Sequence, residues 1–248
     1  MTIEELEGRI RLADGDATVA GLELPGSGAV ETLVLENPEA VEAMHRAFLD
    51  AGAALIRTLS LQASRAALAQ LGLGDRCGEI LWQAAQIARS AARSHSAWVA
   101  GAVGPLFAEC PHGQTRKQFC EQVGTLLDGG CDLICLEGFQ SVEQLLVALH
   151  AKQEVHHCPV ICFLEPGIPY GEIPRLVNEG AEILALRKFD RDLLAMICRA
   201  GALAAIFASK LELPPGGMPD GICLLGGGPG VGPREIAKWH RELMSQEN

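Results

Sequence analysis

The sequence predicts an α/β fold, a single (β/α)8 TIM barrel, and three observations lead to this prediction. Eight short apolar runs alternate with helix-length amphipathic segments along the chain, a pattern typical of a parallel sheet covered by helices. The chain has 248 residues, the length of one such barrel. Several helical segments end in glycine just before a strand, as helix C-termini commonly do. We therefore expect one domain over residues 1–248, with a doubly wound open sheet as the alternative.

The apolar runs mark the expected strands, and the segments between them mark the expected helices. The strands are predicted at residues 10–13, 55–58, 98–103, 133–136, 160–164, 183–186, 204–207 and 222–225. The helices are predicted at residues 38–51, 77–94, 115–129, 142–152, 170–178, 191–200 and 233–244. The helix-ending glycines are Gly52, Gly130, Gly180 and Gly201.

Composition narrows the classes of partner. A formal net charge of −11 argues against nucleic acid and against an anionic membrane surface, because both need clustered Lys and Arg. No apolar run is long enough to span a membrane, and the acidic N-terminus does not resemble a signal peptide. Nine cysteines, an odd number without a CxxC pair, predict free and mostly buried thiols in a reducing compartment. We therefore expect a cytoplasmic protein.

In a barrel of this kind, working residues lie at the C-terminal ends of the strands and in the loops that follow them. Polar residues gather at these positions here, whereas the strand bodies are apolar. The alternative is that loops are polar only because they meet water. The candidate residues are Asp14, Asp16, Arg57, Thr58, Gln62, Glu137, Glu165, Arg187, Lys188, Ser209, Lys210, Gly226, Gly227 and Gly228.

Five segments, in chain order, resemble motifs of the homocysteine S-methyltransferase family, which includes betaine-dependent enzymes. Asp14-Gly15 is similar to LDG, residues 56–64 (IRTLSLQAS) to ITTNTYQAS, and residues 99–105 (VAGAVGP) to VAGSVGP. Residues 132–137 (DLICLE) resemble DLLLFE, and residues 225–236 (LGGGPGVGPREI) align without a gap on VGGCCGTTPEHI. The resemblance implies a (β/α)8 barrel that methylates the thiol of homocysteine. It leaves the methyl donor open among betaine, S-methylmethionine, S-adenosylmethionine and a methyl-corrinoid.

The departures from the family fall on its zinc site. The resemblance implies three cysteine thiolates around zinc, and the matching positions here carry Arg187, Gly228 and Pro229. None of these side chains can donate an electron pair to a metal, so we expect neither zinc nor another cofactor. Zinc would ionise the substrate thiol, and nearby cations such as Arg187 and Lys188 could lower the thiol pKa instead. A relocated metal site at Cys110 with His112, or at residues 156–158, is the alternative.

Glu137, Arg187 and Glu165 are the expected catalytic residues. The resemblance matches Glu137 to a family glutamate that contacts the amino end of the substrate, and the alternative is an ion pair with Arg57 or Arg187. Glu165 belongs to a ring of mixed charge that suits acid–base chemistry or a neutralised structural network. The glycine-rich loop is either a phosphate cradle or the inherited metal loop without its cysteines. The expected substrate-binding residues are Asp14, Arg57, Thr58, Gln62, Lys188, Lys210, Gly226, Gly227 and Gly228.

Three functions follow as hypotheses. The first is methyl transfer to a small thiol or amino-acid-like substrate without the family zinc. The second is a lyase or isomerase reaction on an anionic small molecule. The third is a non-catalytic barrel that serves as a ligand-binding or accessory part of a methyl-transfer system. The sequence leaves open a homo-oligomer and a methyl-transfer partner protein.

Overall fold

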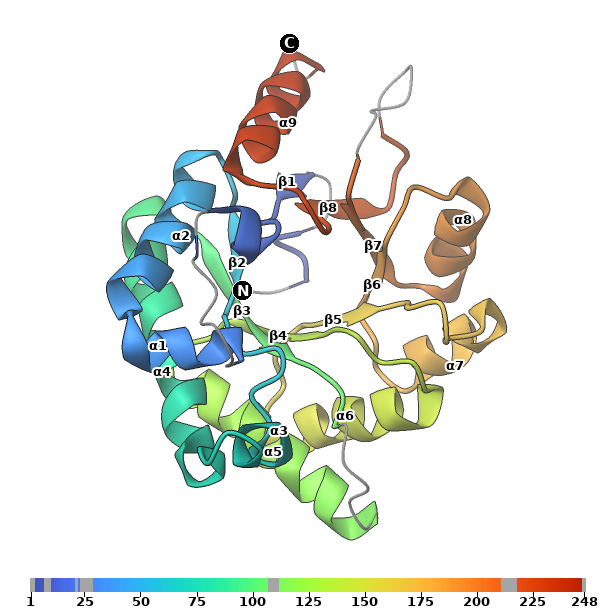
Figure 1. Ribbon diagram of the computed structural model, residues 1–248. Coiled ribbons are helices and arrows are strands. Elements are labelled where there is room, and N and C mark those ends of the chain that lie inside the picture. Colours follow the sequence, from blue (N-terminus) through green and yellow to red (C-terminus); the bar gives the residue numbers. More distant parts are fainter. Residues whose placement is uncertain are drawn as a thin grey trace.

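Eight parallel strands form a closed ring surrounded by helices (Figure 1). The computed structural model describes residues 3–6, 10–20, 22, 29–106, 112–210 and 218–246. The hydrogen-bonded order is β1-β8-β7-β6-β5-β4-β3-β2, and every pair is parallel. A parallel bridge between Ala13 and Leu55 joins the two ends of this order. The predicted (β/α)8 barrel is confirmed, and the open sheet is excluded.

The observed elements follow the predicted order closely. The strands are β1 (Arg11–Leu12), β2 (Leu55–Arg57), β3 (Trp98–Val103), β4 (Leu133–Leu136), β5 (Val160–Phe163), β6 (Ile183–Leu186), β7 (Leu203–Ala208) and β8 (Ile222–Gly227). The α-helices are α1 (Leu33–Glu36), α2 (Pro38–Asp50), α3 (Arg65–Ala69), α4 (Cys77–Ala92), α5 (His112–Asp128), α6 (Val142–Val155), α7 (Ile173–Asn178), α8 (Arg191–Ala200) and α9 (Pro233–Gln246). The 3-10 turns are η1 (Ala17–Ala20), η2 (Val30–Thr32), η3 (Gly74–Arg76), η4 (Arg93–His95) and η5 (Tyr170–Glu172).

Local sequence sets the helix ends. Asn37 precedes α2 and accepts a hydrogen bond from the Ala40 backbone N–H at 3.2 Å, while Pro38 occupies the first helical position. Asp190 caps α8 in the same way, accepting from the backbone of Leu193 at 3.1 Å. The predicted helix-ending glycines all have positive φ, which costs glycine little. These are Gly52, Gly130, Gly180 and Gly201.

The core has two layers. Side chains from strands all round the barrel fill its interior, where Leu55, Leu133, Ile161 and Phe207 are fully buried. A larger apolar layer lies between the strands and the helices. The eight described cysteines are free and mostly buried, as predicted, and burial raises the pKa of Cys223 to about 12. The six buried thiols therefore act as core side chains.

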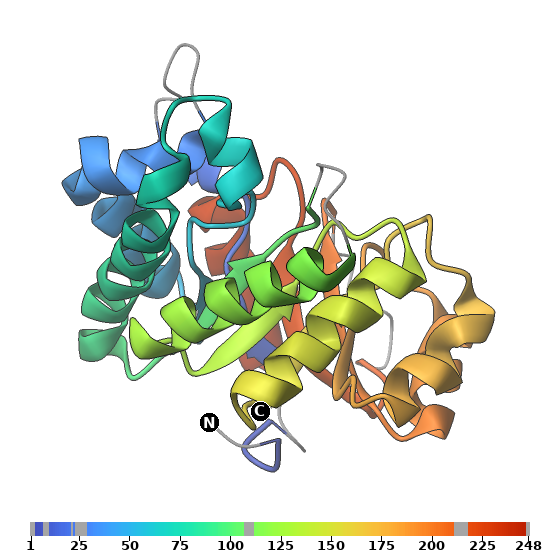
Figure 2. The same ribbon diagram turned by 90° about the horizontal axis from the view of Figure 1, so that it is seen from below.

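The two ends of the barrel differ. Residues 3–6, the dark blue segment at the bottom of Figure 2, lie at the N-terminal end of the barrel, and Leu6 is fully buried there. α1 and α3 lie at the opposite end, beyond the C-terminal ends of the strands (Figure 2). None of the described helices is long and apolar enough to cross a membrane.

Candidate functional site

A cavity of about 920 Å³ opens at the C-terminal end of the barrel, where the predicted site residues converge. Its wall comes from the segments that follow β1 and β2, the ends of β4, β5 and β6, and the glycine-rich loop after β8. Its polar and loop lining includes Asp14, Asp16, Glu31, Arg57, Thr58, Ser60, Gln62, Glu137, Glu165, Arg187, Ser209, Gly227, Gly228 and Pro229.

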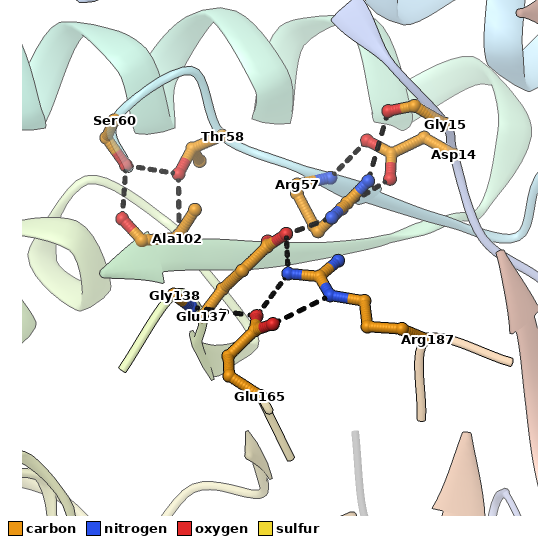
Figure 3. Close-up of polar contacts among 10 residues, drawn as sticks. All are labelled: Asp14, Gly15, Arg57, Thr58, Ser60, Ala102, Glu137, Gly138, Glu165 and Arg187. Atoms are coloured by element: carbon orange, nitrogen blue, oxygen red, sulfur yellow. Dashed lines mark hydrogen bonds and ion pairs between the residues drawn. The ribbon is translucent and has the colours of Figure 1, made fainter. Parts of the chain in front are cut away.

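Arg57, at the end of β2, joins two carboxylates across the mouth (Figure 3). Its Nε donates to Asp14 Oδ1 at 2.8 Å, and its backbone N–H donates to Asp14 Oδ2 at 2.7 Å. Nη1 donates to Glu137 Oε2 at 2.9 Å, and Nη2 donates to the Gly15 carbonyl at 3.0 Å. Both oxygens of Asp14 are therefore occupied by a single residue.

Arg187, at the end of β6, connects the remaining carboxylates (Figure 3). Its Nη2 lies 3.0 Å from Glu137 Oε1 and also donates to Glu165 Oε1. Nε donates to Glu165 Oε2 at 3.2 Å, and the Gly138 backbone N–H donates to Glu165 Oε1. The prediction that Glu137 and Glu165 share one mouth is confirmed. The ion pair considered for Glu137 also forms, with both arginines at once.

Two aromatic rings form the floor beneath the arginines. The guanidinium carbon of Arg57 lies 4.9 Å from the ring centre of Phe207, and that of Arg187 lies 4.2 Å from the ring centre of Phe163. The two rings contact each other, with centroids 4.9 Å apart. At these distances each guanidinium is attracted to the face of a buried ring, which helps to hold both arginines in place.

Burial and charge act against each other on these carboxylates. Burial raises the pKa of Asp14, and the charge and hydrogen bonds of Arg57 offset this effect only in part. Burial would also raise the pKa of Glu137, but the charges of Arg57 and Arg187 together outweigh it and leave that pKa below its ordinary value. Glu137 is therefore held ionised between two cations.

One nitrogen of Arg187 remains available. Nη1 has no hydrogen-bond or ion-pair partner among the described residues, and in Figure 3 it points away from both carboxylates. The Arg187 side chain is 31% exposed, compared with 12% for Arg57. Arg187 is thus the cation of this cluster best placed to donate to a ligand.

Thr58 and Ser60 form a closed hydrogen-bonded unit with the backbone of Ala102. The Ala102 N–H donates to Thr58 Oγ1 at 2.9 Å, and Ser60 Oγ donates to the Ala102 carbonyl at 2.7 Å. The Ser60 hydroxyl has one hydrogen, so the 2.7 Å contact between the two hydroxyls has Thr58 as its donor. Both residues line the cavity, and because both hydroxyl hydrogens are engaged within this unit, the two hydroxyls could serve a ligand only as acceptors.

The backbone N–H groups of the glycine-rich loop donate hydrogen bonds within the protein. Gly227 donates to the Asp14 carbonyl, Gly228 to the Ala208 carbonyl, and Gly230 to Asp16 Oδ2. Val231 and Gly232 also donate within the protein, and Pro229 has no N–H to give. The phosphate cradle considered from the sequence has no free donor in residues 227–232.

Three of the predicted substrate-binding residues do not line the cavity. Lys188 and Lys210 are exposed and do not line the cavity, and Gly226 is buried in β8. Gln62, in contrast, lines the cavity and is exposed. Cys110 and the side chain of His112 lie outside the described residues. Residues 156–158 precede β5, so they lie at the N-terminal end of the barrel, where His157 and Cys158 line a separate cavity.

Sequence reasoning missed Glu31. It lies in η2, is 3% exposed and lines the same cavity. Its Oε1 accepts the backbone N–H of Gln62 at 2.8 Å. Because Glu31 follows no strand, the search of strand ends overlooked it. The available signal was an acidic residue between apolar ones at residues 29–35.

The donor set at the mouth does not match a three-thiolate zinc site. Arg187, Gly228 and Pro229, the positions matched to the family cysteines, all line the cavity. An arginine has no lone pair to give, and glycine and proline have no ligating side chain. Among the described residues, no group of three His, Cys, Asp or Glu side chains is arranged to hold a metal ion.

The sequence profile described as Homocysteine S-methyltransferase matches residues 5–179. The chain belongs to the homocysteine S-methyltransferase family. The match to this family extends through β5 and ends before β6, so it does not include Arg187 or the glycine-rich loop. The part of the cavity that would hold the family's thiolates is thus the part outside the profile.

Curated relatives agree with this assignment, and a solved structure shares the fold. Betaine–homocysteine S-methyltransferase 1 of Danio rerio is 31% identical over 163 residues, or 61% of this chain and 41% of that protein. Methionine synthase of Mycobacterium leprae is 25% identical over 223 residues, which are 80% of this chain and 18% of that protein. This family member therefore spans less than two thirds of either relative. The metallated homocysteine methyltransferase MmuM from Escherichia coli has the same fold, with a TM-score of 0.79 and 19% identity. The superposition covers 94% of this chain and 96% of MmuM.

Proposed function

We propose that this protein transfers a methyl group to the thiol of a small amino-acid-like substrate in the barrel mouth, without a resident zinc ion. Family membership supports the reaction class. The observation that carries the proposal is Arg187, which occupies a position matched to a family cysteine, lines the cavity and keeps Nη1 without a partner among the described residues.

Arg187 would supply the charge that stabilises the substrate as a thiolate. A free thiol has a pKa of about 8.5, so only a few per cent is ionised at neutral pH. A cation within about 4–6 Å favours the charged form and lowers that pKa. Arg187 retains its own proton, because its interactions with Glu165 and Glu137 outweigh burial and raise its pKa. The thiol proton leaves to solvent through the mouth, where Arg187 is partly exposed.

The transfer itself is a displacement at the methyl carbon. The thiolate sulfur forms a bond to that carbon while the bond between the methyl group and the donor atom breaks, and the bonding electrons leave with the donor. Glu137 and Glu165 act as positioning residues in this proposal, because their hydrogen bonds fix the orientation of Arg187. Asp14 and Arg57 support Glu137 from the opposite side.

A second candidate function is ligand binding without catalysis. All four carboxylate oxygens of Asp14 and Glu137 are engaged by arginines. No general base is left free in that pair, which favours a barrel that holds a small molecule for a partner. Binding without turnover would distinguish this function from the first.

The test is methyl transfer by metal-depleted protein. The chain is treated with a chelator and incubated with homocysteine and, in turn, betaine, S-methylmethionine and S-adenosylmethionine, and methionine is measured by mass spectrometry. We expect methionine to accumulate over several turnovers with one of these donors, and the Arg187→Met variant to lose most of the activity. Homocysteine binding without methionine from any donor would support the non-catalytic function instead.

A further inference from the structure

A second cavity, of about 800 Å³, lies at the N-terminal end of the barrel, opposite the mouth. Its lining comes from residues 3–4, the C-terminal part of α6, and the segments that precede β5, β6, β7 and β8. Figure 2 shows the yellow C-terminal end of α6 beside the dark blue segment 3–6. The residues proposed for methyl transfer do not line this cavity, so a ligand bound here would be separate from the reaction.

Lys152, on α6, is a buried lysine on the core-facing side of its helix. It follows Leu145, Ala148 and Leu149 at the spacing of an apolar helix face, and it is 4% exposed. Lysine is rarely buried to this extent without a partner, because a charge that leaves water must be compensated. A cation at this position therefore requires an anionic or hydrogen-bonding partner.

The ammonium group of Lys152 has no hydrogen bond among the described residues. Glu182 Oε2 lies 3.7 Å away, beyond hydrogen-bond range, and that oxygen already accepts the Val160 N–H at 3.0 Å. Burial raises the pKa of the neighbouring Cys158 and Cys162 thiols, so neither supplies an anion at neutral pH. The ammonium is also not sealed from solvent. Its N–H donors are therefore available to a ligand in the cavity that Lys152 lines.

We propose that this cavity binds a small organic acid with one carboxylate and an apolar body, and that Lys152 binds the carboxylate. The lining limits the ligand to one negative charge, because Glu4 and Glu182 line the same cavity and would repel a second. This balance disfavours phosphate esters and dicarboxylates. Val177 and Leu203 are among the apolar residues of the lining and offer contact to a hydrocarbon body.

The acid 4-methylpentanoate and its neutral amide, 4-methylpentanamide, test the proposal by calorimetric titration of the full chain. The two probes have the same shape and differ by one charge. We expect the acid to bind roughly tenfold more tightly than the amide, because its carboxylate meets a buried ammonium, and Lys152→Met to remove that difference. Lys238→Met is the matched control, since Lys238 is exposed, pairs with Glu242 and does not line the cavity. Equal affinities in the unmodified protein, or acid binding by Lys152→Met within about twofold of it, would overturn the proposal.

A second measurement locates the acid and does not depend on the folding of a variant. Gly180, Gly201 and Gly221 line the N-terminal cavity, whereas Gly227 and Gly228 line the mouth. At an acid concentration that saturates the calorimetric signal, the amide resonances of the first three glycines should move. Unmoved resonances of all three would refute the inference, and shifts confined to Gly227 and Gly228 would place the acid at the mouth instead. Neither measurement requires methyl transfer, so failure of the proposed reaction remains a separate result.

Discussion

Arg57 Nη1 and Glu137 Oε2 lie 2.9 Å apart at the barrel mouth, and the two side chains are 12% and 11% exposed. This ion pair links the end of β2 to the end of β4. It also connects the Asp14–Arg57 pair to the Glu137–Arg187–Glu165 group, so five charged side chains form one network (Figure 3). The stability of the mouth therefore depends on each member having its partners.

Replacing Arg57 by Met should destabilise the protein by about 3–5 kcal/mol, because Asp14 and Glu137 would lose a buried cation while remaining buried themselves. Chemical denaturation measures this loss. Arg46→Met is the control, because Arg46 forms an exposed ion pair with Glu42 and its loss should cost at most about 1 kcal/mol. Similar small losses for both variants would contradict the structural role given to Arg57.

Gly15, in the Asp14-Gly15 motif, has no room for a side chain. A Cβ at this position would lie 2.2 Å from the Val231 carbonyl oxygen, so Gly15→Ala should force the first strand and the glycine-rich loop apart and destabilise the protein by about 1–3 kcal/mol. Gly124→Ala is the control. Gly124 lies within α5, a Cβ there would lie 3.6 Å from Val155 Cγ1, and alanine should stabilise the helix by about 0.5–1 kcal/mol. Thermal denaturation of both variants should show opposite signs, and equal signs would count against this packing.

His45, on α2, should make stability depend on pH. Burial lowers its pKa to about 4, with a partial opposing effect from Glu42, and both ring nitrogens lack partners among the described residues. The unfolded chain takes up a proton near pH 6.5 and the folded chain only near pH 4, so the stability present above pH 6.5 falls by about 3 kcal/mol towards pH 4.

The comparison with His45→Leu isolates this effect from the titration of carboxylates. The variant has no imidazole to protonate, so its stability should fall less than that of the unmodified chain between pH 6.5 and pH 4. Urea denaturation at several pH values measures both curves. Parallel curves would show that His45 is protonated equally in the folded and unfolded states.

Zinc content tests the proposal that the mouth works without a resident metal. Arg187, Gly228 and Pro229 offer no thiolate, so protein produced in zinc-supplemented medium should contain far less than one zinc per chain. Elemental analysis after dialysis against a weak chelator gives the result. About one zinc per chain that survives dialysis would mean that other residues bind the metal.

Most of the barrel could be predicted because its strands are continuous apolar runs. β3, β4 and β6 have the predicted bounds, and β1 is shorter because only Arg11 and Leu12 pair with β8 before the bridge at Ala13. α1 and α3 were not predicted. They are 4 and 5 residues long, too short to show a helical period.

The site was predictable only where it follows strands. Glu137, Glu165 and Arg187 meet because parallel strands bring their C-terminal ends to one mouth. Which oxygen each arginine occupies depends on side-chain geometry that no spacing encodes. Glu31 reaches the cavity through a 3-10 turn between β1 and α2, and Lys188 follows a strand but faces solvent.

The most direct test of the central claim is the pKa of a bound substrate thiol, followed by the ultraviolet absorbance of the homocysteine thiolate on metal-depleted protein. If Arg187 stabilises the substrate thiolate in place of zinc, the pKa of the bound thiol should lie at least about one unit below its free value of about 8.5. Arg187→Met should restore the free value. A bound thiol that titrates at its free value in the unmodified protein, or an identical shift in Arg187→Met, would contradict the account.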